Sequence, residues 1–187
     1  MRGMSLPVTE VERELTHTRR VRYEGYKRAD GLWDIEAHLT DIKNHDFRLK
    51  SGVRRAGQPI HSMWLRVTID PDLNIVDAAA TSDVVPYPLG CEEIAPAYRE
   101  LVGLNLVKDF RKNVAQRFGG VRGCTHITEM LAGMPTAAIQ TFAGDMPEER
   151  PDGAKPFQLD QCHALETTSE TVRRFYPKWY RKESTTA

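Results

Sequence analysis

The first half of the chain alternates hydrophobic and polar residues, the period expected of half-buried β-strands. Residues 17–27 and 32–42 both show this alternation. Asp30-Gly31 lies between them, and Asp-Gly between alternating segments is a strong signal for a tight hairpin turn. One face of the second segment carries four hydrophobic residues: Trp33, Ile35, Ala37 and Leu39. The pattern therefore predicts two antiparallel strands joined by a hairpin.

Two further strands follow after a polar, irregular stretch over residues 43–58. Residues 63–69 alternate most clearly of all, and the Pro-Asp-Leu-Asn sequence over residues 71–74 predicts a turn. An alanine-rich strand is expected next, over residues 75–82. The first half thus predicts about four antiparallel strands.

The second half changes to the helical period, with hydrophobic residues three or four apart. Helices are expected over residues 94–102, 106–118 and 127–142, the last broken or kinked at Pro135. Ser169 is a suitable N-cap for a final short helix. Strands followed by helices predict an α+β fold, with an antiparallel sheet of about four strands and helices packed on one face. We expect a loose leader over residues 1–16 and a single domain over residues 17–187.

Composition and charge narrow the classes of function. The chain of 187 residues carries 26 basic and 26 acidic residues, with the two signs interspersed. This balance provides no clustered basic face for nucleic acid. No apolar run approaches the roughly 18 residues of a membrane span, and the N-terminus has no apolar secretory core. We therefore expect a cytoplasmic protein with reduced cysteines that acts on a small molecule, and the sequence leaves oligomerisation open.

The three cysteines have unusual neighbours. Cys91 and Cys124 each follow a glycine and precede a predicted helix, where the helix dipole and free N–H groups stabilise a thiolate. His126 follows Cys124 by two residues, and Cys162 is directly followed by His163. Free cysteine is often a buried core residue, so packing is the competing interpretation for each one.

These residues together suggest a soft sulfur and nitrogen ligand set suited to zinc or iron. We expect the metal ligands to be Cys91, Cys124, His126 and Cys162, with His61 as the alternative fourth ligand or a general base. The sulfurs of Cys91 and Cys124 should then lie close enough to share a ligand, and the Cys162 pair should approach Cys124. Three protein ligands would make the site catalytic, and four would make it structural.

Three functions fit this chemistry. The first is a metal-dependent enzyme for a small aromatic or acyl molecule, with Trp64, Tyr87 and Phe118 as candidate walls of an apolar pocket. The second is a carrier of a metal or an iron–sulfur cluster. The third is a metal-free thiol catalyst, in which Cys124 is the nucleophile and His126 the base.

Four longer motifs run through the chain: GQPIHSMWLRVTID from residue 57, PLGC from residue 88, GGVRGCTHITEML from residue 119 and DQCHA from residue 160. Over roughly residues 17–180 the chain resembles a bacterial family of proteins of unknown function, DUF2889. The resemblance implies no established activity. It implies only an association with the catabolism of aromatic compounds.

Residues 59–131 also show a weaker similarity to iron–sulfur scaffold proteins of the NifU/IscU type. The strand 63–69 and the Gly-Cys pairs ending at Cys91 and Cys124 match that family's order. The chain departs from it at Pro59, where the family has its first cysteine, and at His61, where it has an aspartate. This similarity implies a related fold and an iron–sulfur cluster as a cofactor.

Overall fold

The computed structural model describes residues 6–145 and 153–182 of the chain. It divides into two compact units, the first ending at Thr141 and the second beginning at Phe142. Residues 6–16 are exposed and form no helix or strand, and the loose leader over residues 1–16 stays a prediction. The expectation of one domain from residue 17 onward stays a prediction.

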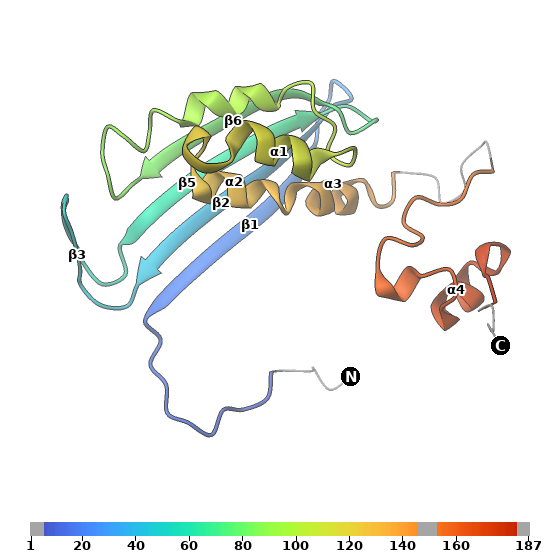
Figure 1. Cartoon of the computed structure of the whole chain (residues 1–187), viewed down its shortest axis with the longest axis horizontal. Helices are drawn as coiled ribbons and strands as arrows, with labels where there is room; N and C mark the ends of the chain where they lie inside the picture. Colours follow the sequence, from blue (N-terminus) through green and yellow to red (C-terminus); the bar gives the residue numbers. More distant parts are fainter. Residues whose placement is uncertain (1–5, 146–152, 183–187) are drawn as a thin grey trace. The chain divides into compact units, whose positions relative to one another are not determined.

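A four-stranded antiparallel sheet forms the base of the first unit, as predicted (Figure 1). Its order is β1-β2-β5-β6. The strands are β1 (His17–Lys27), β2 (Trp33–Lys43), β5 (Pro59–Ile69) and β6 (Ile75–Val84). The register places Val21 opposite Leu39 and Leu39 opposite Met63, so the hydrophobic residues of neighbouring strands face the same side.

The stretch expected to be irregular contains a second, two-stranded sheet, which the sequence analysis missed. It consists of β3 (Phe47–Leu49) and β4 (Gly52–Arg54). Strands of three residues are too short to show an alternating pattern. The hairpin is held to the segment after β6, because Ser51 Oγ donates to the carbonyl oxygen of Pro86 at 2.7 Å.

The helices of the first unit lie across one face of the sheet, which confirms the α+β prediction (Figure 1). They are the 3₁₀ helix η1 (Ala95–Leu101), α1 (Phe110–Phe118), the 3₁₀ turn η2 (Gly120–Arg122), α2 (Thr125–Leu131) and α3 (Met134–Phe142). As predicted, the chain breaks next to Pro135.

Two helix predictions need correction. The element expected over residues 94–102 is a 3₁₀ helix and not an α-helix. The helix expected from residue 106 starts only at Phe110. The cause is local, since the side chain of Asn105 accepts hydrogen bonds from the N–H groups of Val107 and Lys108, and Asp109 has a left-handed backbone with φ 52°.

The core lies between the sheet and these helices. Its largest fully buried side chains come from both layers: Ile35, Leu39, Met63, Leu65, Ile69, Ile75, Tyr98, Leu101, Leu106, Ile127, Met130 and Leu131. Burial of such side chains contributes roughly 1.5–3 kcal/mol each. The stack of Tyr98 on Phe118, at 4.6 Å between ring centroids, joins η1 to α1.

Close backbone approach fixes how α2 and α3 cross β1. A Cβ atom on Gly133, between the two helices, would lie 2.5 Å from the ring of Tyr23. The Tyr23 hydroxyl donates to the carbonyl oxygen of Met130 at 2.8 Å. On the same strand, a Cβ atom on Gly25 would lie 1.9 Å from Thr141 Oγ1. The two glycines therefore allow the helices to contact the strand directly.

The second unit contains the 3₁₀ helix η3 (His163–Leu165), the helix α4 (Glu170–Phe175) and the 3₁₀ helix η4 (Pro177–Trp179). Ser169 caps α4 as predicted, since its hydroxyl accepts the N–H of Val172 at 3.2 Å. Across both units, none of the helices in the described ranges has the length and apolar character needed to cross a membrane.

The contact at Gly25 gives a stability prediction. We expect Gly25→Ala to lower the free energy of unfolding by about 1–3 kcal/mol, because the new methyl group overlaps Thr141. Thr141 cannot easily turn away, since its hydroxyl donates to the carbonyl oxygen of Ala137 at 2.8 Å. Urea unfolding followed by circular dichroism measures the change.

The matched control is Gly90→Ala, where the nearest atom to the new methyl group is 3.9 Å away. It should change stability by no more than about 0.5 kcal/mol. Equal effects at the two glycines would contradict the close packing of α3 on β1.

Candidate functional site

On three neighbouring strands, β1, β2 and β5, the line of side chains that faces the core ends in polar residues. On β2 the buried row of Trp33, Ile35, Ala37 and Leu39 continues into Asp41. The strand register places Arg19 of β1 opposite Asp41, and Asp41 opposite His61 of β5. A register shift between Asp41 and Ile42, typical of a β-bulge, lies at this point. One cross-strand row thus brings a cation, a carboxylate and an imidazole together on the helix-covered face.

The Asp41 carboxylate is the centre of this row and is only 4% exposed. Arg19 binds it with two bonds, from Nε to Oδ1 at 2.9 Å and from Nη2 to Oδ2 at 2.8 Å. His17 Nε2 lies 2.8 Å from Oδ1, and His61 Nδ1 lies 3.0 Å from Oδ2. Burial alone would raise the pKa of Asp41, but the bonds from Arg19 and His17 outweigh it and lower that pKa to about 2.

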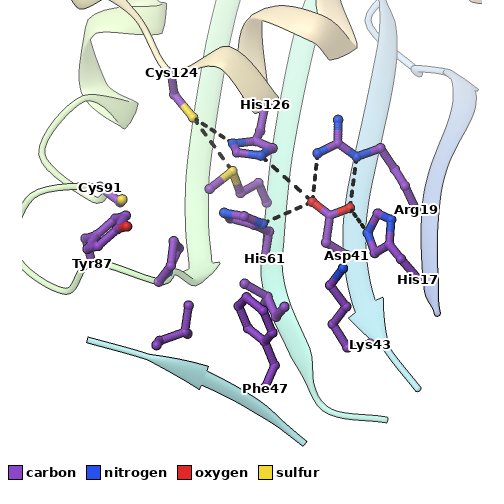
Figure 2. A pocket seen from close by; sticks show the side chains of 14 residues that line it. His17, Arg19, Asp41, Lys43, Phe47, His61, Tyr87, Cys91, Cys124 and His126 are labelled. Atoms are coloured by element: carbon purple, nitrogen blue, oxygen red, sulfur yellow. Dashed lines mark hydrogen bonds and ion pairs between the residues drawn. The ribbon is translucent and has the colours of Figure 1, made fainter. Parts of the chain in front are cut away.

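The charge of Asp41 decides the tautomer of His61. An ionised carboxylate accepts hydrogen bonds but cannot donate, so His61 Nδ1 must carry the hydrogen. Burial and the nearby His126 lower the pKa of His61 below its usual range, which favours the neutral ring. The lone pair of His61 is then on Nε2. Figure 2 shows this second ring nitrogen pointing away from Asp41, toward the side of the cavity with Cys91 and Tyr87.

Cys124 is the N-cap of α2, as the sequence predicted. The buried Tyr98 fixes it there, because the Tyr98 hydroxyl accepts the Cys124 N–H at 2.9 Å. Burial raises the pKa of the Cys124 thiol, but hydrogen bonds from the His126 ring and the N–H groups of Ile127 and His126 outweigh it, so the pKa is lowered overall. These contacts stabilise the thiolate relative to that of a free cysteine.

His126 lies between the thiol and the carboxylate. Its Nδ1 is 3.8 Å from Cys124 Sγ, and its Nε2 is 3.9 Å from Asp41 Oδ2 (Figure 2). The rings of His126 and His61 are neighbours, with centroids 3.9 Å apart. Both histidines therefore turn one nitrogen toward Asp41, while the second nitrogen of His126 faces the Cys124 sulfur and that of His61 faces the cavity.

Asp41, His61 and His126 form a group that could hold a metal ion, with one ligand atom from each lying within 4.8 Å of the others. The hydrogen bonds argue against Asp41 as a direct ligand. Its two oxygens already accept bonds from Arg19, His17 and His61, which fill the lone-pair positions of a carboxylate. Asp41 is better suited to orient the histidines than to bind an ion itself.

These residues open onto a cavity of about 470 Å³. Its polar end consists of His17, Arg19, Asp41, Lys43, His61 and His126. Its remaining walls are mostly apolar and come from β3, β5, the segment after β6 and the start of α2: Phe47, Leu49, Ile60, Met63, Pro86, Tyr87, Cys91 and Cys124. A cavity of this size suits a small organic molecule.

Four of the five predicted site residues, His61, Cys91, Cys124 and His126, line this one cavity. Cys91 is half-buried and lies in a turn, not at a helix start as expected. The metal-compatible group among the described residues includes neither cysteine sulfur, so a ligand shared by Cys91 and Cys124 stays a prediction. Cys162 is exposed and belongs to the second unit, and its approach to Cys124 also stays a prediction.

Two of the three aromatic residues expected to line an apolar pocket, Trp64 and Phe118, do not line this cavity. Trp64 stacks on the ring of His38 at 3.8 Å, and Phe118 packs on Tyr98 in the core. Tyr87 does line the cavity.

Sequence reasoning missed Asp41, Arg19, His17 and Lys43. The sequence did contain a signal for Asp41. The residue continues the alternating hydrophobic positions of its strand, and a carboxylate at a buried position needs hydrogen-bonding partners.

The lowered pKa of Asp41 predicts how stability depends on pH. The ionised form is favoured by folding, so its contribution is present above about pH 4 and is lost as pH falls toward 2. For a pKa of about 2 in the folded state and about 3.9 in the unfolded state, the contribution is on the order of 2 kcal/mol. We expect the wild-type advantage over Asp41→Asn in the free energy of unfolding to shrink by about half of that between pH 6 and pH 3.

Urea unfolding at several pH values measures this difference. The same substitution at the exposed Asp72 is the control and should stay within about 0.5 kcal/mol of wild type throughout. An advantage over Asp41→Asn that does not change with pH would contradict an ionised, tightly held Asp41.

The comparisons with known proteins give a family but no activity. No curated protein and no solved structure matches the chain, and the resemblance to NifU/IscU-type scaffold proteins is not supported. A family model described as "Protein of unknown function (DUF2889)" matches residues 17–140, which include the strands, Cys91, Cys124 and His126. The chain therefore belongs to the DUF2889 family.

Proposed function

We propose that the first unit is a metal-dependent enzyme that binds zinc or iron and acts on a small molecule in the adjoining cavity. The observation that carries the proposal is the pairing of His61 with Asp41. A carboxylate that accepts one imidazole N–H and leaves the other nitrogen free is the usual outer shell of a metal-binding histidine. At 3.0 Å, the His61 Nδ1 to Asp41 Oδ2 bond has this form.

We assign three protein ligands from this orientation: His61 through Nε2, His126 through Nδ1 and Cys124 through Sγ. Among the described residues, the group of ligand atoms within 4.8 Å of one another does not include the Cys124 sulfur, so these side chains must move closer together to bind one ion. The 3.8 Å between Cys124 Sγ and His126 Nδ1 is close to the separation of two ligands of one zinc ion, about 3.5 Å for Zn–S near 2.3 Å and Zn–N near 2.05 Å. The lowered pKa of the Cys124 thiol also favours the ionised form that metals bind. Two nitrogens and one sulfur suit zinc or iron.

The cavity supports an enzyme over a structural metal site. Structural zinc sites are closed by four protein ligands, whereas catalytic sites keep one position open. Here the three proposed ligands lie at the wall of a cavity of about 470 Å³, which leaves room for water or substrate at the metal. An open metal position activates a water molecule or polarises a carbonyl oxygen. Cys91, across the same cavity, is the residue that would close the site if it were the fourth ligand.

Elemental analysis of the purified full chain tests the ligand set. We expect about one equivalent of zinc or iron per chain, reduced at least tenfold in Cys124→Ser and in His61→Ala, because each variant loses a direct ligand. His45→Ala, at an exposed histidine of the same unit, is the matched control and should keep the metal. Wild-type protein without metal after growth in supplemented medium would contradict the proposal.

The same measurement on Cys91→Ser decides between an open and a closed site. Retention of the metal, with a change in substrate binding alone, is expected for three ligands and an open position. Loss of the metal equal to that in Cys124→Ser would make Cys91 the fourth ligand and the site structural.

A second metal prediction concerns Asp41. If Asp41 orients His61 without binding the ion, Asp41→Asn should weaken metal affinity by about 10–100-fold and not abolish binding. Competition against a chelator of known affinity measures the change. An effect as large as that of His61→Ala would instead make Asp41 a direct ligand.

A metal-free thiol catalyst is the second candidate, and the contact between Cys124 Sγ and His126 Nδ1 favours it as well. In that case His126 serves as the base and Cys124 as the nucleophile, with the N–H groups at the start of α2 facing the sulfur. Rapid alkylation of Cys124 by iodoacetamide at neutral pH, unchanged by added zinc or iron, would select this candidate. Protection of the thiol by the metal would select the first.

A further inference from the structure

The polar end of the cavity contains one cation, Lys43, that has no anionic partner in the part of the chain that the structure describes. Lys43, at the end of β2, is half-buried, and its ammonium group lies 5.6 Å from the centroid of the Phe47 ring. Lys43 forms no ion pair with any residue in the described ranges. The side chain extends into the cavity beside Phe47 (Figure 2).

The other cationic side chains at this end are already engaged. Arg19 binds both oxygens of Asp41 and also pairs with Glu129 of α2. His17 is bonded to Asp41 at 2.8 Å. Lys43 is therefore the cation in this cavity that has capacity for an anion from outside, and a half-buried ammonium gains most from a partner that is itself partly removed from water.

The wall next to Lys43 is apolar and includes two aromatic rings. The Phe47 ring centroid is 5.6 Å from the ammonium group, and Tyr87 lines the cavity on the side of Cys91. Leu49, Ile60 and Pro86 also line the cavity. A ligand with its negative charge at Lys43 must place the atoms next to that charge against Phe47, where a flat ring packs well by offset or edge-to-face contact.

We propose that the cavity binds a small aromatic carboxylate, with the carboxylate at Lys43 and the ring between Phe47 and Tyr87. This names the substrate class of the site to which we assign a metal-dependent activity, and in that sense it rests on the proposed function. The binding step itself needs only Lys43 and the apolar wall. A cavity of about 470 Å³ accommodates an acid with one or two rings.

Binding of 2-naphthoate and of its uncharged analogue 2-naphthamide to the full chain tests the assignment. Isothermal titration calorimetry should give about tenfold tighter binding of the acid, the equivalent of one charge-assisted contact. Lys43→Met keeps most of the side chain and should remove this preference, while Lys43→Arg should retain most of it. Lys50→Met, at an exposed lysine in the turn of the β3–β4 hairpin, is the control and should bind as wild type.

Each contrary result has a distinct meaning when the titration is repeated on metal-loaded and chelator-treated protein. A preference for the acid that survives Lys43→Met but disappears on chelation would assign the carboxylate to the metal and overturn the role of Lys43. Equal binding of decanoate and 2-naphthoate would overturn the aromatic class, and no binding of either naphthalene would overturn the whole inference. Retention of the preference in a chain that never binds metal supports the inference and rejects the proposed function alone.

Discussion

The candidate site depends on one buried carboxylate. Asp41 stands where the hydrophobic row of β2 would otherwise continue, and an unpaired charge there would cost several kcal/mol. Arg19, His17 and His61 compensate it from both neighbouring strands. Arg19 in turn pairs with Glu129, so the same network joins the sheet to α2. The need to satisfy Asp41 thus sets the position of the histidines and of the helix that carries Cys124.

This constraint explains why the group of closely spaced ligand atoms (Asp41, His61 and His126) differs from the ligand set that we propose (His61, His126 and Cys124). The ligand atoms that lie closest together are those facing Asp41, because the carboxylate attracts one nitrogen from each histidine. The nitrogens on the opposite sides of the rings face the cavity and the thiol. Asp41 orients the histidines from the side facing away from the cavity, so the cavity side stays free for an ion and a small molecule. The β3–β4 hairpin and the segment after β6 supply apolar walls there.

Most of the strands and helices could be predicted from the spacing of hydrophobic residues, but most of the residues around Asp41 could not. The strands were predictable because 11-residue segments such as β2 and β5 repeat their period several times. The β3–β4 hairpin was not, since three residues carry no period and its hydrogen bond to Pro86 joins residues distant in sequence. The Gly-Cys pattern predicted Cys124 at a helix start. The partners of Asp41 depend on the register between neighbouring strands, which no local pattern reveals.

The arrangement of the site along the chain has a consequence for the order in which the protein becomes functional. Its residues begin with His17 at the start of β1 and end with His126 in α2, and the strands between them pair in an order that places β5 beside β2. No fragment that ends before α2 contains His126, the third histidine of the cavity after His17 and His61. During synthesis, the first unit therefore acquires its site only after nearly all of its residues have left the ribosome, and a partly made chain exposes Cys91 without the helix that faces it.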